Sequence, residues 1–220
     1  MTIRSTITIA SFCLCTLAVA QPSITLLDAP YTKTGMYQSE PGHALLAAAN
    51  QGLLPHYKSF TATAYGEKRF LLNELSLVQL GMVLPVNLGA FALQATSFGS
   101  AAHRQSKIGL GYGRRLTESV NVGVQFHYLH YSIAGYGQVG TVNAAAGVLY
   151  KISSTLTAGL QIDNLTKKAL GAGKSIIPPQ VVSAGIGYAT SNSFYAEATL
   201  VKETAKPIGL QASLQYAVQE

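Results

Sequence analysis

Hydrophobic and polar residues alternate along most of the chain that follows residue 57. From Val120 to Tyr128 every second residue is valine, phenylalanine or tyrosine, and asparagine, glycine, glutamine and histidine lie between them. Successive side chains of a β-strand point to opposite faces, so this pattern predicts a strand with one apolar and one polar face. The same contrast recurs at residues 107–112, 156–163, 182–188, 194–200 and 208–216. The chain is therefore predicted to be all-β.

Ten segments carry this pattern or a less regular form of it, at residues 58–66, 71–85, 89–98, 106–115, 120–132, 141–151, 156–164, 181–189, 194–202 and 208–218. Short polar turns alternate with longer connections between them, which predicts antiparallel up-and-down strands with every short turn at one end. Several segments reach the roughly 9–11 residues that a tilted strand needs to cross the hydrocarbon of a membrane.

The polar face of these segments carries almost no charge. Residues 75–102 contain no ionisable side chain, and residues 119–150 contain no Asp, Glu, Lys or Arg and only two histidines. Charged residues make up 11% of the whole chain, whereas soluble domains carry about 25%. An apolar face against lipid, with charge moved to the rims, explains this distribution. The sequence thus predicts an antiparallel transmembrane β-barrel of about ten strands, over residues 58–220. A soluble β-barrel or sandwich is the alternative.

The first twenty residues have the features of a cleaved signal peptide. Arg4 precedes an uncharged apolar stretch that ends in Ala18-Val19-Ala20 before Gln21, a pattern that signal peptidases cut. Cys13 and Cys15, the chain's two cysteines, lie within this stretch. Export to the cell outer membrane is the expectation, and a buried N-terminal helix or strand is the alternative.

Residues 21–57 do not alternate, and residues 43–50 could form a short helix. The interior of a ten-stranded barrel is narrow, so this segment is a candidate for a plug or a periplasmic cap. An ordinary flexible leader is an equally good interpretation. Polar residues of the segment or of the lumen-facing parity are the candidate plug and lumen residues: Asn50, Gln51, Asn121, Gln125, His127, Gln161 and Glu197.

Two glycine-rich stretches resemble nucleotide-binding motifs but lack the context that those motifs need. Residues 171–175 (GAGKS) look like the end of a phosphate loop, yet Lys168 stands where its first glycine belongs. Residues 135–140 (GYGQVG) join two predicted strands, whereas the dinucleotide fingerprint needs a helix after it. No nucleotide or other cofactor is expected. The net charge of +6 is spread without a basic stripe, so nucleic acid is not an expected partner either.

No pattern in the sequence indicates an enzyme. His127 and His130 are three residues apart on a predicted strand, so they face opposite sides and cannot share a metal. His127, Ser183 and Glu197 all have lumen parity, but nothing in the sequence brings them within hydrogen-bond reach. The chain is predicted to be non-enzymatic.

Several blocks resemble the PorV/PorQ-like outer-membrane proteins, a group distantly similar to the FadL family of channels for hydrophobic compounds. The most specific block is Tyr65-Gly66-Glu67-Lys68-Arg69-Phe70, and the stretches at 50–51, 110–116 and 122–128 are also similar. The resemblance extends over residues 45–218, mostly as a pattern. Members of that group tend to be longer and to have more strands.

What the resemblance implies is an outer-membrane barrel that touches lipid and other outer-membrane proteins. Better-known relatives are partner or shuttle subunits of type IX secretion, so an accessory subunit of a secretion or assembly complex is the first expectation. A narrow FadL-like channel for a hydrophobic solute is the alternative.

Overall fold

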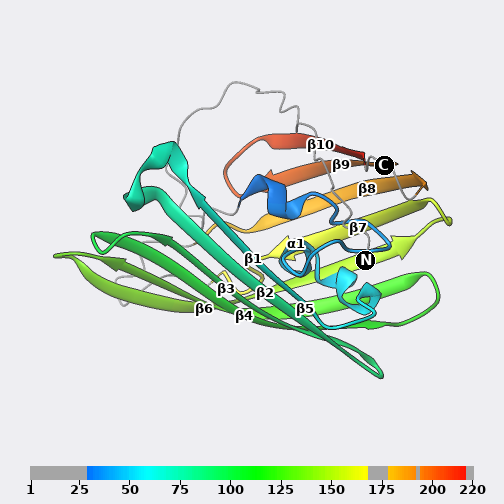
Figure 1. Cartoon of the computed structure of the whole chain (residues 1–220), viewed down its shortest axis with the longest axis horizontal. Coiled ribbons are helices and arrows are strands. Elements are labelled where there is room, and N and C mark those ends of the chain that lie inside the picture. The colour runs from blue at the N-terminus through cyan, green and yellow to red at the C-terminus, as the bar shows by residue number, and fades with distance from the viewer. Residues whose placement is uncertain (1–28, 168–177, 192–193, 217–220) are drawn as a thin grey trace, which may run out of the picture.

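The computed structural model describes residues 29–167, 178–191 and 194–216; the predicted signal peptide lies outside them. Ten strands follow one another in sequence order within one antiparallel sheet (Figure 1). Their bounds are β1 Thr61–Lys68, β2 Ser76–Val86, β3 Gly89–Gly99, β4 His103–Arg115, β5 Val120–Ile133, β6 Gly137–Lys151, β7 Leu156–Asp163, β8 Val181–Ser191, β9 Phe194–Glu203 and β10 Ile208–Tyr216. The prediction of an all-β chain with ten up-and-down strands is confirmed.

The first hairpin is where predicted and observed strands differ most. Residues 69–75 form two short 3-10 turns, η3 (Arg69–Leu71) and η4 (Asn73–Leu75), so β2 begins at Ser76 instead of residue 71. Within η3, Phe70 and Leu71 have φ angles of 54° and 60°, in the left-handed region that bulky residues rarely adopt. The apolar residues at 70–72 therefore belong to a loop, although their hydrophobicity suggests the start of a strand.

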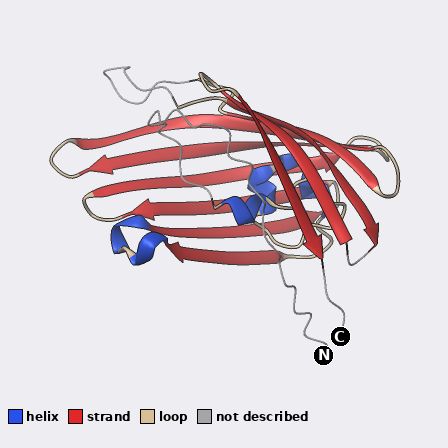
Figure 2. Cartoon of the chain, turned by 90° about the horizontal axis from the view of Figure 1, so that it is seen from above, coloured by secondary structure: helices blue, strands red, loops and turns tan. Residues whose placement is uncertain are grey.

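The sheet is open, which differs from the closed barrel expected from the sequence. β1 and β10 stand at the two ends of the strand order and are not paired with each other. Figure 2 shows the sheet twisted and curved, with short helical turns inside the curve. The physical reason is the space that these turns and their connections occupy, because residues 29–57 take up much of the concave side that closure would narrow.

We call residues 29–57 the inner segment. It contains the 3-10 turn η1 (Pro30–Lys33), the single α-helical turn α1 (Leu46–Ala49) and the 3-10 helix η2 (Gln51–His56). The largest cluster of buried hydrophobic residues joins this segment to the concave face of the sheet, with Met36, Tyr37, Ala44, Leu46, Ala47, Ala49, Leu53, Leu54 and Tyr57 from the segment and Val83, Ala90, Ala92 and Leu149 from strands. The core of the molecule is thus the contact between segment and sheet.

The two faces of the sheet differ in polarity. In β5, Asn121, Gln125 and His127 are buried on the concave face, while Phe126 and Tyr128 on the convex face are 61% and 50% exposed. The same arrangement holds in β2, β3 and β4, whose exposed convex side chains include Val78, Leu80, Met82, Leu84, Phe91, Leu93, Ile108 and Leu110. No helix among the described residues is long and apolar enough to cross a membrane.

Candidate functional site: the seat of the inner segment

A row of three glycines on the concave face receives η2. Gly113, Gly123 and Gly147 are register partners on β4, β5 and β6. A Cβ added to Gly113 would lie 2.7 Å from the Cβ of Leu54, and one added to Gly147 would lie 2.7 Å from the backbone nitrogen of Gln51. At Gly123 it would collide with the carbonyl oxygen of Gln51. Only glycine lets the inner segment approach the sheet this closely.

A chain of amide side chains fixes η2 above these glycines. The Gln51 Nε2 donates to the Gln125 Oε1 at 3.2 Å, and the Gln125 Nε2 donates to the Gln94 Oε1 at 3.0 Å. Asn50 is the N-cap residue that precedes η2, and its side-chain oxygen accepts a hydrogen bond from the Gly52 backbone nitrogen at 2.9 Å, the usual role of asparagine at a helix N-terminus. Gln51 and Gln125 are both fully buried, so each bond replaces one that water would otherwise make.

His56, the last residue of η2, connects this helix by hydrogen bonds to β5 and to an earlier part of the inner segment. Its Nε2 lies 3.0 Å from the Asn121 amide nitrogen, and its Nδ1 lies 2.8 Å from the Ser39 carbonyl oxygen. Both contacts are satisfied by a neutral ring that accepts at Nε2 and donates from Nδ1. Burial lowers the pKa of His56, and the nearby positive charges of Arg115, Lys151 and Lys58 lower it further.

A second group of glycines receives the ring of Tyr37. Cβ atoms added to Gly159, Gly185 and Gly187 would lie 2.5, 2.7 and 2.8 Å from atoms of Tyr37. The side chain is 1% exposed, and this burial raises the pKa of Tyr37 to about 12. Tyr37 therefore anchors the first half of the inner segment to β7 and β8 as η2 anchors the second half to β4, β5 and β6.

Glu197 of β9 holds the backbone beside Tyr37. Its two carboxylate oxygens each lie 3.1 Å from the Gly35 backbone nitrogen. The hydroxyls of Tyr195 and Ser213 also donate to it, at 2.8 and 2.9 Å. On β10, the Gln215 Oε1 accepts from the Gln38 Nε2 at 2.6 Å. The carboxylate is thus compensated by hydrogen-bond donors that include the inner segment's own backbone.

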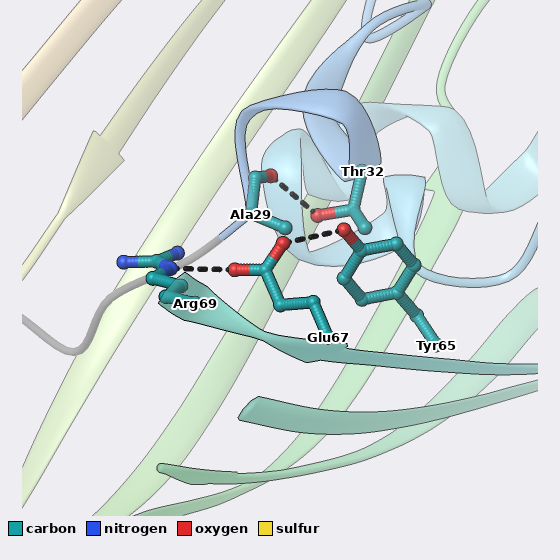
Figure 3. A network of polar contacts seen from close by, with 5 residues as sticks. All are labelled: Ala29, Thr32, Tyr65, Glu67 and Arg69. Atoms are coloured by element: carbon teal, nitrogen blue, oxygen red, sulfur yellow. Dashed lines mark hydrogen bonds and ion pairs between the residues drawn. The ribbon is translucent and has the colours of Figure 1, made fainter. Parts of the chain in front are cut away.

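The start of the inner segment lies near β1. Ala29 packs with Leu77 of β2 and Phe98 of β3, and Tyr65 of β1 packs against this cluster. Figure 3 shows Ala29 close to a polar group in which Glu67 accepts from the Tyr65 hydroxyl at 2.6 Å and pairs with the Arg69 Nε at 2.6 Å. The inner segment therefore contacts strands next to both edges of the sheet.

A cavity of about 310 Å³ lies between the inner segment and β4–β10. Its polar lining includes His127, Asn143, Gln161, Ser183, Asp163 and Glu203, and Lys33 and Lys107 also line it. The Asn143 Oδ1 is buried without a hydrogen-bond partner among the described residues. Among those residues, no group of three or more His, Cys, Asp or Glu side chains could hold a metal ion.

The structure divides the sequence-derived candidates between two places. Asn50, Gln51, Asn121 and Gln125 lie in the seat of η2, whereas His127 and Gln161 line the cavity. Glu197 holds the Gly35 backbone. His127 and Ser183 line the same cavity, but Glu197 is not part of that lining, and its hydrogen bonds go to other residues. Asn50, Gln51, Asn121, Gln125 and Glu197 therefore hold the inner segment against the sheet.

The sequence analysis did not predict the two groups of glycines against which the inner segment packs. It also did not predict the contacts of Tyr37 and His56. The available signal was the frequency of glycine on the polar face of the predicted strands, but strand register was needed to align those glycines. No protein-family model and no curated protein matches this chain.

Proposed function

We propose that this chain is a non-enzymatic outer-membrane protein whose strands cross the lipid as the wall of a plugged β-barrel, and that it serves as an accessory subunit of an outer-membrane secretion or assembly complex. The single observation that carries the proposal is the reversed polarity of the sheet. Large apolar side chains are exposed on the convex face, and amides and glycines are buried on the concave face.

Such a surface is unfavourable in water. Exposed apolar area costs about 25 cal/mol per Å² relative to an apolar environment, and soluble monomers rarely expose contiguous apolar patches above a few hundred Å². In lipid the same side chains are in a compatible solvent, and each of the strands β2 to β9 is paired with a neighbouring strand on both sides.

The filled interior favours the accessory role over transport. The inner segment is fixed by the amide chain, by Glu197 and by close packing on glycines. The cavity beside it is lined by many polar and charged residues, which does not suit a hydrophobic solute. The remaining surfaces available for function are the loops and the convex wall, and these can bind other proteins.

Membrane insertion can be tested with single tryptophan reporters, because the chain contains no Trp. In vesicles that contain brominated phosphatidylcholine, we expect strong quenching of Phe126→Trp on the convex face. Leu129→Trp, a buried position on the concave face of the same strand, is the matched control and should be quenched much less. Equal quenching at both positions would contradict insertion in this orientation.

The accessory role requires a second experiment in the native host. We expect the protein purified in mild detergent to bring other outer-membrane proteins with it in fixed stoichiometry. Purified protein in vesicles should show no solute permeation. Permeation that depends on displacement of the inner segment would favour the channel.

A further inference from the structure

We propose that the two edge strands of the sheet pair between two copies of this chain, β1 of each copy with β10 of the other, so that two copies together form one closed barrel. The inference rests on the proposed membrane location, where unpaired strand edges are least tolerated. Three features carry it, namely two unpaired edges, the several turns and connections of the inner segment on the concave side, and an exposed concave position on β10.

The first feature is the pair of edges. Among the described residues, β1 pairs only with β2 and β10 only with β9. Each edge strand therefore presents a row of backbone N–H and C=O groups without a strand partner. Open sheet edges do not occur in contact with hydrocarbon, and in water they promote association with other strands. Each edge needs a partner strand.

The second feature is the width of the interior. With strands about 4.8 Å apart and tilted by about 40°, a closed ten-stranded barrel is about 20 Å across and leaves about 10 Å between facing side chains, the width of one helix. The inner segment places three short helical elements, η1, α1 and η2, on the concave side. It meets the sheet first near β2, then at β9, then at β1 and finally at β5, through Ala29, Gly35, Ala44 and Gln51. It therefore runs between distant strands of the open sheet more than once, and a closed ten-stranded barrel leaves little room for that path.

The third feature is the concave face near β10. Gln211 points to this face, yet it is exposed, whereas Gln125 on the concave face of β5 is fully buried. The cavity of about 310 Å³ extends along the concave face from β4 and includes Gln211 in its lining. The inner segment reaches β10 through the hydrogen bond between Gln38 and Gln215, but it leaves the concave face around Gln211 uncovered. Concave side chains of another copy would cover this region.

The two edges are complementary to each other. β1 has 8 residues and β10 has 9, and the even number of strands makes them run antiparallel when two copies share one orientation in the membrane. On β1 the convex side chains next to the edge include Ala62 and Ala64, and on β10 they include Leu210 and Leu214. Pairing them would continue the apolar convex face without interruption.

A two-fold axis along the barrel would satisfy both edges of both copies at once, leaving no edge open. With ten strands from each copy, the barrel would fall between porins of about 16–18 strands, which enclose a channel, and transporters of about 22 strands, which enclose a plug. Such a lumen accommodates two inner segments.

Cysteine cross-linking in native membranes tests the proposal, in a background with Cys13 and Cys15 replaced by serine. One copy carries Ala64→Cys on β1 and a differently tagged copy carries Ala212→Cys on β10, both on the convex face. A short bis-maleimide tolerates small differences in register. We expect a covalent dimer that contains both tags when the copies are co-expressed. Ala144→Cys, on the convex face of β6 far from either edge, replaces Ala212→Cys in the matched control and should give none.

The double variant Ala64→Cys/Ala212→Cys separates the other outcomes. An internal cross-link without a dimer means that one copy closes on itself, which overturns the inference. No cross-link at all, or cross-links only to other proteins, also overturns it. Flotation of the same samples with vesicles is scored independently. Protein that floats without a dimer refutes the dimer alone, whereas protein that does not float refutes the membrane proposal.

Discussion

The convex and concave faces of this sheet are built from different residues for different reasons. On the convex face of β5, Val124, Phe126 and Tyr128 are large and exposed. On the concave face of the same strand, Gly123 and Gln125 are small or polar and are covered by the inner segment. The difference shows that hydrophobicity alone does not mark the inside of this molecule. Close packing with hydrogen bonding organises the concave face, and the proposed membrane location would account for the apolar convex one.

A charge placed on the convex face should have the largest effect and tests the difference between the two faces most strongly. Phe126→Arg should lower the free energy of unfolding in vesicles by about 2–4 kcal/mol, the cost of arginine near the middle of a lipid-facing barrel wall. Leu116→Arg, in the turn between β4 and β5, should cost about 0–1 kcal/mol because it lies near the interface. Guanidinium unfolding in vesicles measures both. Equal effects would mean that the convex face is in water.

A methyl group on the concave face tests the close packing. Gly123→Ala places a Cβ against the Gln51 carbonyl, and overpacking of this kind costs about 1–3 kcal/mol. Gly66→Ala on the convex face of β1 is the control, since the nearest atom to its new Cβ would be 3.9 Å away. The same unfolding assay should show little change there. An unchanged free energy of unfolding in Gly123→Ala would mean that η2 does not pack against Gly123 as described.

Removal of the central amide tests the hydrogen bonds separately from the packing. Gln125→Leu leaves the Gln51 Nε2 and Gln94 Oε1 without this partner, and an unsatisfied buried group costs about 1–3 kcal/mol. We expect lower stability and faster tryptic cleavage at Lys58, which follows η2. Gln138→Leu is a matched change at an exposed position and should have little effect. Unchanged cleavage in Gln125→Leu would contradict a role for the amide chain.

The smallest expected effect is a pH dependence at His56. Its pKa is lowered in the folded state, so the unfolded chain binds more protons as the pH falls. The stabilisation is therefore complete above the ordinary pKa of about 6.5 and declines below it, toward the folded pKa. Tryptic cleavage at Lys58 should rise between pH 7 and pH 5.

His56→Gln should flatten part of this profile. Burial also lowers the pKa of His43, so His43→Gln in the same background should remove a further part. A profile unchanged in the double variant would place the pH dependence elsewhere in the molecule.

The strands, and the residues that share each face of a strand, could be predicted because period-two alternation is a local property. The open sheet could not be predicted, because the path of the inner segment over the concave side is not a local property, and residues 21–57 show no regular pattern. The row of glycines beneath η2 could not be predicted for a similar reason. Gly113, Gly123 and Gly147 are far apart in sequence and become one row only through strand register. The loop at Phe70 and Leu71 was missed because apolar side chains in an exposed turn resemble a strand.

The most direct test of the central claim is a set of spin labels on β5, at positions 124, 126, 128 and 129, in lipid vesicles, with relaxation by oxygen and by a water-soluble nickel chelate. The account predicts high oxygen and low nickel accessibility at Val124, Phe126 and Tyr128, and low accessibility to both reagents at Leu129, which is buried on the concave face. High nickel accessibility at the convex positions would show that this face is in water and would contradict the membrane assignment.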